Sequence, residues 1–520
     1  MTTASATIPS AAIDGTVAEG LTVGTTAGIV RGGLAARGVR VFRGIPYAQP
    51  PVGALRFGAP QPATAWTGVR DALTFGPAVP QSANARRGSA VPPDATDGDN
   101  YLTVNVWTPR TDGSRPVMVW IHGGAYMGGG TATASFEAGR LAADGQVVVV
   151  TVNHRVAMEG YAQIVGAPAN RGLLDVTAAL EWVQYNIAGF GGDPGSVTIF
   201  GQSAGAGAVA ALLAMPAARG LFHRAIAQSV PGTFLTPALA SAITARVAAD
   251  LGCAPTIDGL GQVDPVELAE TADAVGSRML QYAESWGVVA ETNTPFSPVV
   301  DGVVLPTDPW MALATGAAAD VPLIVGHTRD EFRAFTRASG TVPDITEEQA
   351  RHAIGVFGPD GAVDDYYRVL DASGTATDPV SAYETVNSDW LFRMPSAHLA
   401  LAGSAGGAPT YLFELAYTVP KWQGLLGAPH SADHPLVFGN FEGGVADRMY
   451  VSPVDADTER LGDRMRQAWA EFAYTGKPGW DEFTPDGLQT MVFDTEPRQE
   501  RYPYALTLQA YRRPEVLDLA

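Results

Sequence analysis

The chain has 520 residues, of which 46% are hydrophobic, and its formal net charge at pH 7 is −20. This length and composition allow a large buried core. The charge argues against nucleic acid as a partner, because no basic cluster offers phosphates a surface, and no run approaches the ~20 apolar residues of a membrane span.

The first informative element is the apolar run Val117–Ile121, which predicts a buried strand. It ends in the glycine-rich segment His122–Tyr126. A loop without bulky side chains at the end of a strand can direct backbone N–H groups toward a carbonyl oxygen, although a plain tight loop with a structural His122 is the alternative. Further along the chain, Val147–Val152 is typical of a buried parallel strand.

The sequence Gly201-Gln202-Ser203-Ala204-Gly205 predicts a nucleophile elbow. Gly191–Pro194 predicts a turn, Val197–Phe200 a buried strand and Ala204–Met215 a packed helix. This strand, turn and helix order would expose the hydroxyl of Ser203, provided that its glycine neighbours let the backbone segments approach closely. A plain glycine turn is the alternative interpretation.

Together with these motifs, several other segments make the chain resemble the type-B carboxylesterases, the family that includes the cholinesterases. The resemblance implies one α/β-hydrolase domain over residues 1–520, with a large, mostly parallel twisted sheet flanked by helices. Pro80–Gly98 and Leu251–Thr294 would be insertions over the rim of the site. The matching segments are Phe42–Ala48, Leu102–Trp107, Gly172–Asp175, Asn186–Pro194, Pro298–Gly302, Val437–Gly439 and Phe472–Gly476.

By this resemblance the backbone N–H groups of Gly124, Ala125 and Ala204 form an oxyanion hole. The acid of the triad should follow a strand, which Val321–Gly326 predicts. In the segment after it, Glu331 matches the family's catalytic glutamate.

Two features of this segment qualify the match. Asp330 precedes Glu331 and is the alternative acid. Phe332 stands where the family usually has glycine.

The base is expected at His430, eight residues before Phe438, with His434 as the competitor. His430, Asp433 and His434 also resemble a zinc motif, but that motif needs a helix. Pro435 follows at once, so we expect no room for such a helix to continue and no metal.

The resemblance includes departures that bear on the substrate. Gln202 stands where the family usually has glutamate, and Pro80–Gly98 contains no aromatic residue to meet a quaternary ammonium. We therefore expect neutral esters rather than choline esters.

Ser229 matches a family serine near the triad. Candidates for lining the substrate pocket, each equally compatible with a core position, are Tyr126, Trp286, Phe332, Phe335, Trp390 and Phe392.

The single cysteine, Cys253, excludes an intrachain disulfide. Secreted relatives carry a cysteine where Tyr101 stands here, so the resemblance favours a cytoplasmic location. Met1–Gly20 lacks the basic and apolar segments of a signal peptide, and we expect none. Cys253 has no histidine nearby in sequence, which favours a structural role.

The resulting hypothesis is a serine carboxylic ester hydrolase that acts through an acyl-enzyme on small to medium neutral aryl or alkyl esters. Its expected partners are a small-molecule ester and water, with no cofactor. A hydrolase of aryl carbamates or amides would need the same residues. A non-catalytic binding protein on the same fold is the third alternative, but such family members typically lose the nucleophile. The sequence does not distinguish a monomer from a homodimer.

Overall fold

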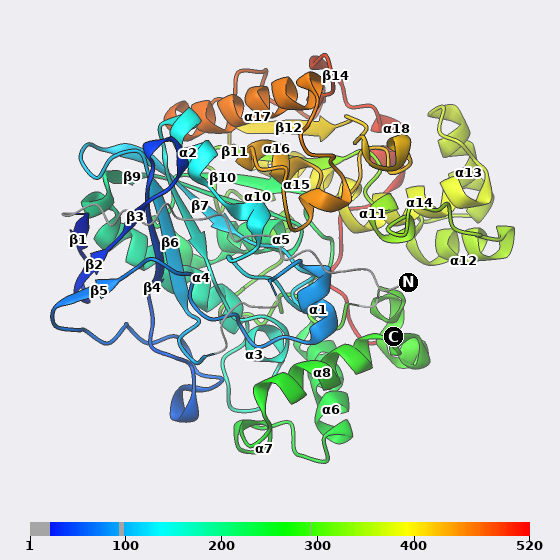
Figure 1. The fold of residues 1–520 in the computed structure, drawn as a ribbon. Helices are drawn as coiled ribbons and strands as arrows, with labels where there is room; N and C mark the ends of the chain where they lie inside the picture. The colour runs from blue at the N-terminus through cyan, green and yellow to red at the C-terminus, as the bar shows by residue number, and fades with distance from the viewer. Residues whose placement is uncertain (1–20, 93–97, 293) are drawn as a thin grey trace, which may run out of the picture.

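The computed structural model describes residues 21–92, 98–292 and 294–520, and it is built around one large mixed sheet (Figure 1). The N-terminal segment for which we expect no signal peptide lies outside the described residues. In order from one edge, the strands are β14 (Arg498–Arg501), β13 (Gln489–Phe493), β12 (Thr410–Leu415), β11 (Leu323–Thr328), β10 (Arg224–Gln228), β9 (Gly192–Gln202), β7 (Arg115–Ile121), β8 (Val148–Val152), β6 (Thr103–Thr108), β4 (Arg40–Pro46) and β3 (Gly33–Leu34).

The middle of this sheet, from β8 to β13, is parallel, and both margins are antiparallel. The four strands predicted from apolar runs correspond to β7, β8, β9 and β11 of the parallel part. Parallel strands are buried on both faces, which is why they read as continuous Val and Ile runs. A separate small sheet contains β1 (Thr22–Gly24), β2 (Ile29–Arg31) and β5 (Val69–Asp71).

The turn predicted at Gly191–Pro194 is wrong in its extent. Gly191 has a left-handed backbone with φ 79°, but β9 already begins at Gly192. The pairing with β7 is irregular between Arg115 and Val117, and this irregularity accommodates the glycine and proline at the start of the strand. The prediction therefore placed the turn correctly at Gly191 but wrongly extended it into the first residues of β9.

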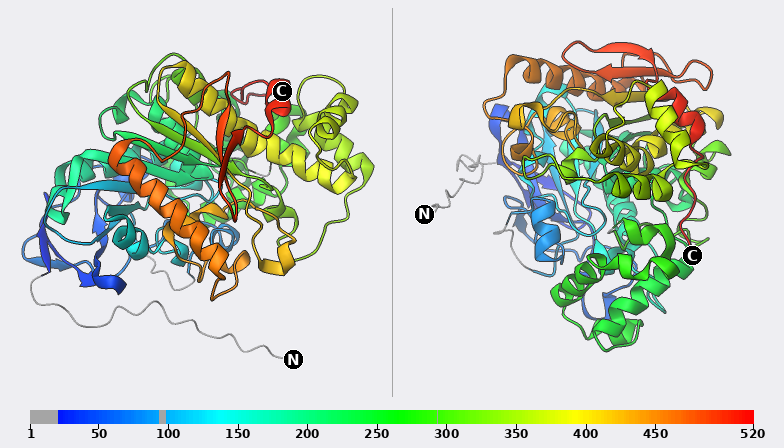
Figure 2. Two further views of the ribbon diagram at one scale, coloured as in Figure 1. Left: turned by 90° about the horizontal axis from the view of Figure 1, so that it is seen from above. Right: turned by 90° about the vertical axis from the view of Figure 1, so that its right-hand side faces the viewer.

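Helices cover both faces of the sheet, and two hydrophobic clusters lie between them and the strands (Figure 2). The alternation along β7 separates the clusters, because Val117, Val119 and Ile121 belong to one and Met118 and Trp120 to the other. The first cluster packs under α4 (Arg171–Asn186), α5 (Ala204–Ala214), α10 (Pro309–Ala314) and α15 (Met394–Ala405), and the second under α2 (Gly139–Gly145), α16 (Asp433–Phe438) and α17 (Ala456–Thr475).

The remaining helices lie mostly outside these two layers, α6 to α8 below the sheet and α12 to α14 to its right in Figure 1. They are α1 (Ala83–Gly88), α3 (Ala157–Tyr161), α6 (Pro237–Asp250), α7 (Ile257–Gly261), α8 (Pro265–Gly276), α9 (Ala283–Trp286), α11 (Arg333–Thr336), α12 (Glu347–Phe357), α13 (Val363–Ala372), α14 (Pro379–Ser388) and α18 (Ala505–Ala510). A π-helical segment, η8 (Asp389–Arg393), joins α14 to α15.

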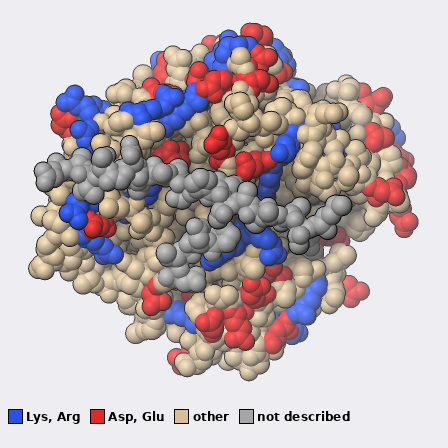
Figure 3. Space-filling model, viewed as in Figure 1, with Lys and Arg blue, Asp and Glu red and all other residues tan. Residues whose placement is uncertain are grey.

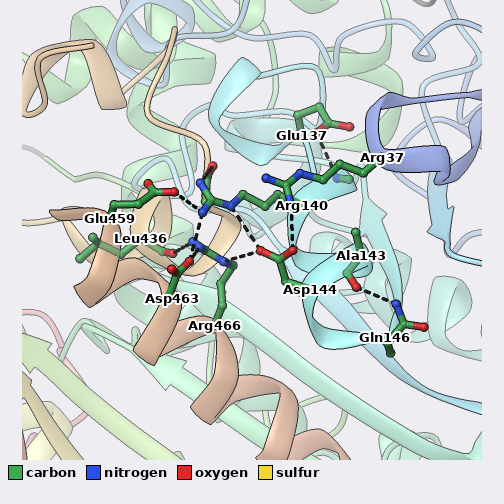
Figure 4. A network of polar contacts seen from close by, with 12 residues as sticks. Arg37, Glu137, Arg140, Ala143, Asp144, Gln146, Leu436, Glu459, Asp463 and Arg466 are labelled. Atoms are coloured by element: carbon green, nitrogen blue, oxygen red, sulfur yellow. Dashed lines mark hydrogen bonds and ion pairs between the residues drawn. The ribbon is translucent and has the colours of Figure 1, made fainter. Parts of the chain in front are cut away.

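An arginine and carboxylate network fixes α17 to α2 and α16 (Figure 4). Arg466 of α17 donates to the Leu436 carbonyl of α16 at 2.9 Å and pairs with Asp144 of α2 at 3.4 Å. Arg140 of α2 pairs with Asp144 at 3.3 Å and with Asp463 of α17 at 3.1 Å. Because α16 directly follows His430, this network also supports the chain segment that carries His430.

The surface in Figure 3 carries charges of both signs, with acidic side chains gathered over α8 and over α12 and α13. Helix α8 contributes Glu267, Glu270 and Asp273 to this distribution. None of the helices in the described residues combines the length and apolar character needed to cross a bilayer.

Candidate active site

Ser203 occupies a strained backbone position between β9 and α5. Its φ is 59° and its ψ is −129°, a conformation that residues other than glycine seldom adopt. Its N–H donates to the Gln228 carbonyl at 2.9 Å, which ties the turn to the end of β10. The strand, the turn and the helix therefore lie in the order expected of a nucleophile elbow.

The two flanking glycines are required by close backbone contacts. A Cβ atom at Gly205 would lie 2.1 Å from the carbonyl oxygen of Ile121, and one at Gly201 would lie 2.6 Å from the backbone of Gly205. Neither distance is compatible with a side chain. Gly201 and Gly205 thus let α5 start directly against the end of β7, where the glycine-rich loop begins.

The loop after β7 lies beside Ser203. A Cβ at Gly123 would lie 3.1 Å from the Cβ of Ser203, which places the loop against the elbow. Three successive residues, Gly124, Ala125 and Tyr126, have positive φ angles of 126°, 54° and 57°. Such strain in residues other than glycine is typical of functional loops.

The backbone N–H groups of Gly124, Ala125 and Ala204 donate to no acceptor within the described residues. The loop carbonyls are used instead, since the Gly124 carbonyl accepts from Met127 and Gly128 at 3.0 Å. Ala204 is the first residue of α5, where a helix leaves N–H groups without internal partners. Unpaired N–H groups beside the partly buried Ser203 suit an anionic oxygen.

The loop is supported from α1 and the residues before it. Gln81 donates to the Gly129 carbonyl at 2.9 Å and accepts from the Gly129 N–H at 3.0 Å. Glu270 of α8 accepts from the Ala83 N–H at 2.7 Å, and Arg448 donates to the carbonyls of Arg87 and Gly88. The described parts of the two predicted rim insertions therefore contact each other.

Glu331 and His430 are joined by a hydrogen bond of 2.5 Å between Oε2 and Nδ1, and both side chains are buried. Glu331 follows β11, and its Oε1 accepts from the Ser229 hydroxyl at 2.6 Å and from the Thr328 N–H at 2.8 Å. The carboxylate thus has a bonded partner on each oxygen. These bonds fix it at the carboxyl ends of β10 and β11, and β10 lies beside β9, the strand that ends in the elbow.

Burial, the largest single influence, would raise the pKa of Glu331, but it is outweighed by the adjacent His430 imidazole and the hydrogen bonds combined. Together with the bonds from His430, Ser229 and Thr328, the imidazole lowers the pKa of this carboxyl below its ordinary value. Glu331 therefore remains ionised at neutral pH. An ionised carboxylate at Nδ1 holds the proton of the neutral ring on Nδ1 and leaves a lone pair on Nε2.

The two competing residues have other surroundings. Asp330 accepts from the Ala428 N–H at 2.9 Å and pairs with Arg333 at 3.2 Å. His434 is buried between Trp120 and Phe136, with ring centroids 6.2 Å and 5.3 Å away, and neither ring nitrogen has a partner in the described residues. Burial, and then the nearby His430, lowers the pKa of His434 to about 3.

The expectation that Pro435 leaves no room for a helix is wrong. Helix α16 spans Asp433–Phe438 and continues through Pro435. A proline in the first turn removes only an N–H that has no partner within the helix, so it is tolerated there. Within the described residues, no group of three His, Cys, Asp or Glu side chains is arranged to hold a metal ion.

Gln202, the last residue of β9, contacts the imidazole of His430 directly. Its amide nitrogen Nε2 lies 3.0 Å from Nε2 of the ring, and its Oε1 accepts from the Ser431 hydroxyl at 3.1 Å. Sequence reasoning named Gln202 as a supporting residue of the site that lacks the usual negative charge, but it did not place the amide against His430. It did not identify Ser431, because nothing in the sequence places residue 431 against residue 202.

Two of the predicted pocket residues lie against the His430 ring, and a third packs on one of them. Phe392 of η8 stacks on it with centroids 4.2 Å apart, and Phe335 lies 5.5 Å from it. Phe335 is 54% exposed, so its ring is accessible to a bound molecule. Phe332 lies 5.3 Å from Phe335 and extends this aromatic group.

The other three predicted pocket residues pack elsewhere. Tyr126 is buried against Tyr161 at 5.0 Å. Trp286 is buried against Tyr282 at 4.4 Å. Trp390 packs on Phe357 at 4.8 Å.

Cys253 is half-buried and packs at the margin of the first cluster, which is consistent with a structural cysteine.

Sequence reasoning named Asp433 in a possible zinc motif but did not anticipate that it is a second buried acid near the triad candidates. Asp433 accepts from the Gln228 amide at 2.7 Å, and burial raises its pKa to about 6. It also missed the stacking of His122 on His154, with centroids 4.3 Å apart. Burial, and then the neighbouring His154, lowers the pKa of His122 to about 3, so this ring is neutral. Neither the burial of Asp433 nor the stacking has a signal in the sequence.

The described residues enclose two cavities. The larger, of about 320 Å³, is lined by Met215, Phe222 and Val321 at the far end of α5 from Ser203. The smaller, of about 160 Å³, borders Asp330, Ser388 and Arg393. Neither cavity is lined by Ser203 or His430.

A model of the carboxylesterase family matches residues 19–510. The chain is 35% identical to the para-nitrobenzyl esterase of Bacillus subtilis, covering 91% of this chain and 94% of that protein. It is 34% identical to the phenmedipham hydrolase of Pseudarthrobacter oxydans, with the same two coverages. Among solved structures, carboxylesterase EST55 of Geobacillus stearothermophilus superimposes with a TM-score of 0.82 at 33% identity, covering 95% of this chain and all of that one.

Both the sequence and the fold match over almost the whole length of these relatives. The matched region contains the elbow, the glycine-rich loop, and the bonded pair Glu331 and His430. The chain therefore belongs to the carboxylesterase family, and it is a carboxylesterase with the α/β-hydrolase fold.

Proposed function

We propose that the protein hydrolyses small to medium neutral aryl or alkyl esters through an acyl-enzyme formed on Ser203. The observation that carries this proposal is the 2.5 Å bond between Glu331 and His430, with Glu331 at the same end of the parallel strands as a serine held at φ 59°. The same geometry supports Glu331 as the acid rather than Asp330, and His430 as the base rather than His434. We place all of these residues in one domain around the single large sheet.

In the first half of the proposed reaction, Nε2 of His430 takes the proton from the Ser203 hydroxyl as its oxygen attacks the ester carbonyl carbon. The carbonyl π bond opens and its electron pair moves to the oxygen. Glu331 keeps the proton on Nδ1 and stabilises the imidazolium that forms. His430 then returns its proton to the leaving alkoxide as the bond between the carbonyl carbon and that oxygen breaks.

The oxygen anion of this intermediate is assigned to the N–H groups of Gly124, Ala125 and Ala204. These donors have no other acceptor in the described residues, so they need not break a bond within the protein to bind the oxyanion. Donors fixed in advance lower the barrier because they do not reorganise during the reaction.

In the second half, water takes the place of the alcohol. His430 removes one water proton as the oxygen attacks the acyl carbon, and the tetrahedral intermediate collapses by releasing Ser203. The proton on His430 returns to the serine oxygen, and the carboxylic acid leaves. Every proton in both halves passes through Nε2 of His430, and the cycle involves ester, water and residues of this chain alone.

Neutral substrates are favoured by the groups around His430. Gln202 presents an amide where a carboxylate would attract a cation, and the ring faces closest to His430 belong to Phe392 and Phe335. A quaternary ammonium over an aromatic face gains roughly 0.5 to 2 kcal/mol, and only Phe335 offers an exposed face here.

We therefore expect a neutral butyryl thioester to be hydrolysed with a kcat/KM about tenfold or more above that of butyrylthiocholine. The comparison is made at about 0.15 M salt, where the diffuse negative charge of the protein is screened. A preference for the choline ester would contradict the proposed pocket and assign the cation to Phe335, which Phe335→Ala would then test.

The proposed activity itself is tested with p-nitrophenyl esters of increasing acyl length, assayed beside a phthalate or benzoate diester and with Ser203→Ala as the control. Hydrolysis by the wild type and none by the variant is the expected result. Equal rates of hydrolysis by both proteins would overturn Ser203 as the nucleophile. No hydrolysis of any ester would overturn the proposed activity and favour a binding role.

A second candidate function is the hydrolysis of aryl carbamates or amides by the same residues. The observation that favours it is the similarity to a protein named as a phenmedipham hydrolase. Phenmedipham and simple aryl carbamates therefore belong in the same assay. A kcat/KM for them above that for every ester would make this the main activity.

A further inference from the structure

The contact between Gln202 and His430 involves the nitrogen that the proposed mechanism uses. His430 donates from Nδ1 to Glu331, so the neutral ring carries a lone pair on Nε2. The group 3.0 Å from this lone pair is the Gln202 amide, which must therefore donate an N–H to it. In the structure, Gln202 thus occupies the position from which Nε2 would accept a proton.

Ser431 fixes the orientation of that amide at a cost in backbone strain. Its hydroxyl donates to Oε1 of Gln202 at 3.1 Å, which leaves the amide nitrogen facing the ring. Ser431 has a φ of 71°, in the left-handed region that favours glycine. A serine retained in this conformation points to a use for its hydroxyl.

We propose that Gln202 and Ser431 form an amide switch that hydrogen-bonds Nε2 of His430, in its neutral or its protonated state, whenever Nε2 is not bonded to Ser203 or to the leaving group. In the neutral state, the amide N–H donates to Nε2 and the serine hydroxyl donates to Oε1. In the protonated state, the amide is rotated by half a turn, so that Oε1 accepts from Nε2–H and the serine oxygen accepts from the amide N–H. No covalent bond of the switch changes.

The switch depends on two side chains that each carry a donor and an acceptor. A glutamine amide and a serine hydroxyl can exchange these roles, whereas an ionised carboxylate only accepts and a thioether is at most a weak acceptor. A glutamate at position 202 would therefore suit only the protonated ring. Gln202 is in this sense a positioning residue, since it acts through His430, and the inference rests on the proposed function of His430 as the base.

Other titratable groups also face His430. They are Glu331 after β11, and Asp433 and His434 on α16, while Phe392 and Phe335 cover the ring with apolar surface. Asp433 has a pKa of about 6, so its titration falls in the same range as that of a histidine. The switch is therefore tested by differences between variants that all retain Asp433.

The first test compares the pH dependence of kcat/KM for a neutral p-nitrophenyl ester in the wild type and in Gln202→Glu. A carboxylate beside Nε2 favours the imidazolium, so the neutral base appears only at higher pH. We expect the acid limb of the profile to move up by about one pH unit, which is a loss of about tenfold near the foot of the limb. A Gln202→Glu profile that superimposes on that of the wild type would overturn the switch.

Gln184→Glu is the matched control, because it adds the same charge elsewhere. Gln184 donates to the carbonyls of Pro194 and Leu221, and Pro194 lies near the start of β9 while the elbow lies at its end. The acid limb of the Gln184→Glu profile should coincide with that of the wild type. If Gln184→Glu moved the limb as far as Gln202→Glu does, the effect would come from net charge, and the switch would be rejected.

The second test removes the serine hydroxyl with Ser431→Gly, which also relieves the left-handed strain. The melting temperature should therefore not fall, while kcat should drop by about three- to tenfold because the amide loses its partner. In a Gln202→Met background, Ser431→Gly should cause no further loss. Equal losses in both backgrounds would show that Ser431 acts independently of Gln202 and would overturn the switch.

The two proposals fail in different ways. If Ser203→Ala retains full esterase activity, the proposed function falls whatever the pH profiles show. If Ser203→Ala is inactive and Gln202→Glu has an unshifted limb, the proposed function stands and the amide switch alone is wrong.

Discussion

Glu331→Gln is expected to lower kcat for a neutral ester by about 10³- to 10⁴-fold. The reason lies in the bonds that Glu331 already makes. Ser229 and Thr328 both donate to Oε1, so in the variant the amide oxygen takes this position and the amide nitrogen faces His430. An N–H facing Nδ1 forces the ring proton onto Nε2, which removes the lone pair that would accept the proton of Ser203.

Asp330→Asn is the matched control for Glu331→Gln, since it makes the same change one residue earlier. Asp330 bonds to the Ala428 N–H and pairs with Arg333, and it has no contact with the His430 ring in the described residues. Its kcat should stay within a few-fold of the wild type. A larger loss in Asp330→Asn than in Glu331→Gln would move the acid by one residue and contradict the proposed triad.

His430→Ala is expected to lower kcat by about 10³-fold or more, because an unassisted serine hydroxyl is hardly deprotonated near neutral pH. The loss should appear in kcat rather than in KM, since the proposed mechanism assigns the ring to proton transfer. Steady-state kinetics with one p-nitrophenyl ester, together with the melting temperature of each protein, measure the effect.

The control for the base is His434→Leu. His434 is buried between Trp120 and Phe136, and both of its ring nitrogens are without partners in the described residues. An apolar side chain of similar size should leave the melting temperature unchanged or raise it, because no buried nitrogen is left unsatisfied. If His434→Leu lost as much activity as His430→Ala, the assignment of the base would be wrong.

The parts of the fold that the sequence predicts are those where one strong local pattern decides the structure. The apolar runs predicted four parallel strands, because such strands are buried on both faces. The elbow was predicted because Gly201 and Gly205 are needed wherever backbone segments approach this closely. The small N-terminal sheet and the antiparallel edges were not predicted. Strands β1 and β3 are only three and two residues long, and β4 and β6 lack a continuous apolar run.

The site was predictable to the extent that its residues belong to motifs, and contacts between motifs were not predictable. Glu331 and His430 were named from the family resemblance, but the stacking of Phe392 on His430 depends on the π-helical segment between α14 and α15. The bond from Gln202 to His430 and the role of Ser431 depend on side chains more than 200 residues apart in sequence. Pro435 was misjudged because its position within the helix decides whether a proline ends it.

The most direct test of the central claim is to label the protein with an organophosphate and locate the adduct by peptide mapping. The account predicts one phosphoryl group per chain, attached to Ser203, with loss of esterase activity in proportion to labelling. Glu331→Gln and His430→Ala should label far more slowly than the wild type. An adduct on any other serine, with Ser203 unmodified in an inactivated protein, would contradict the account.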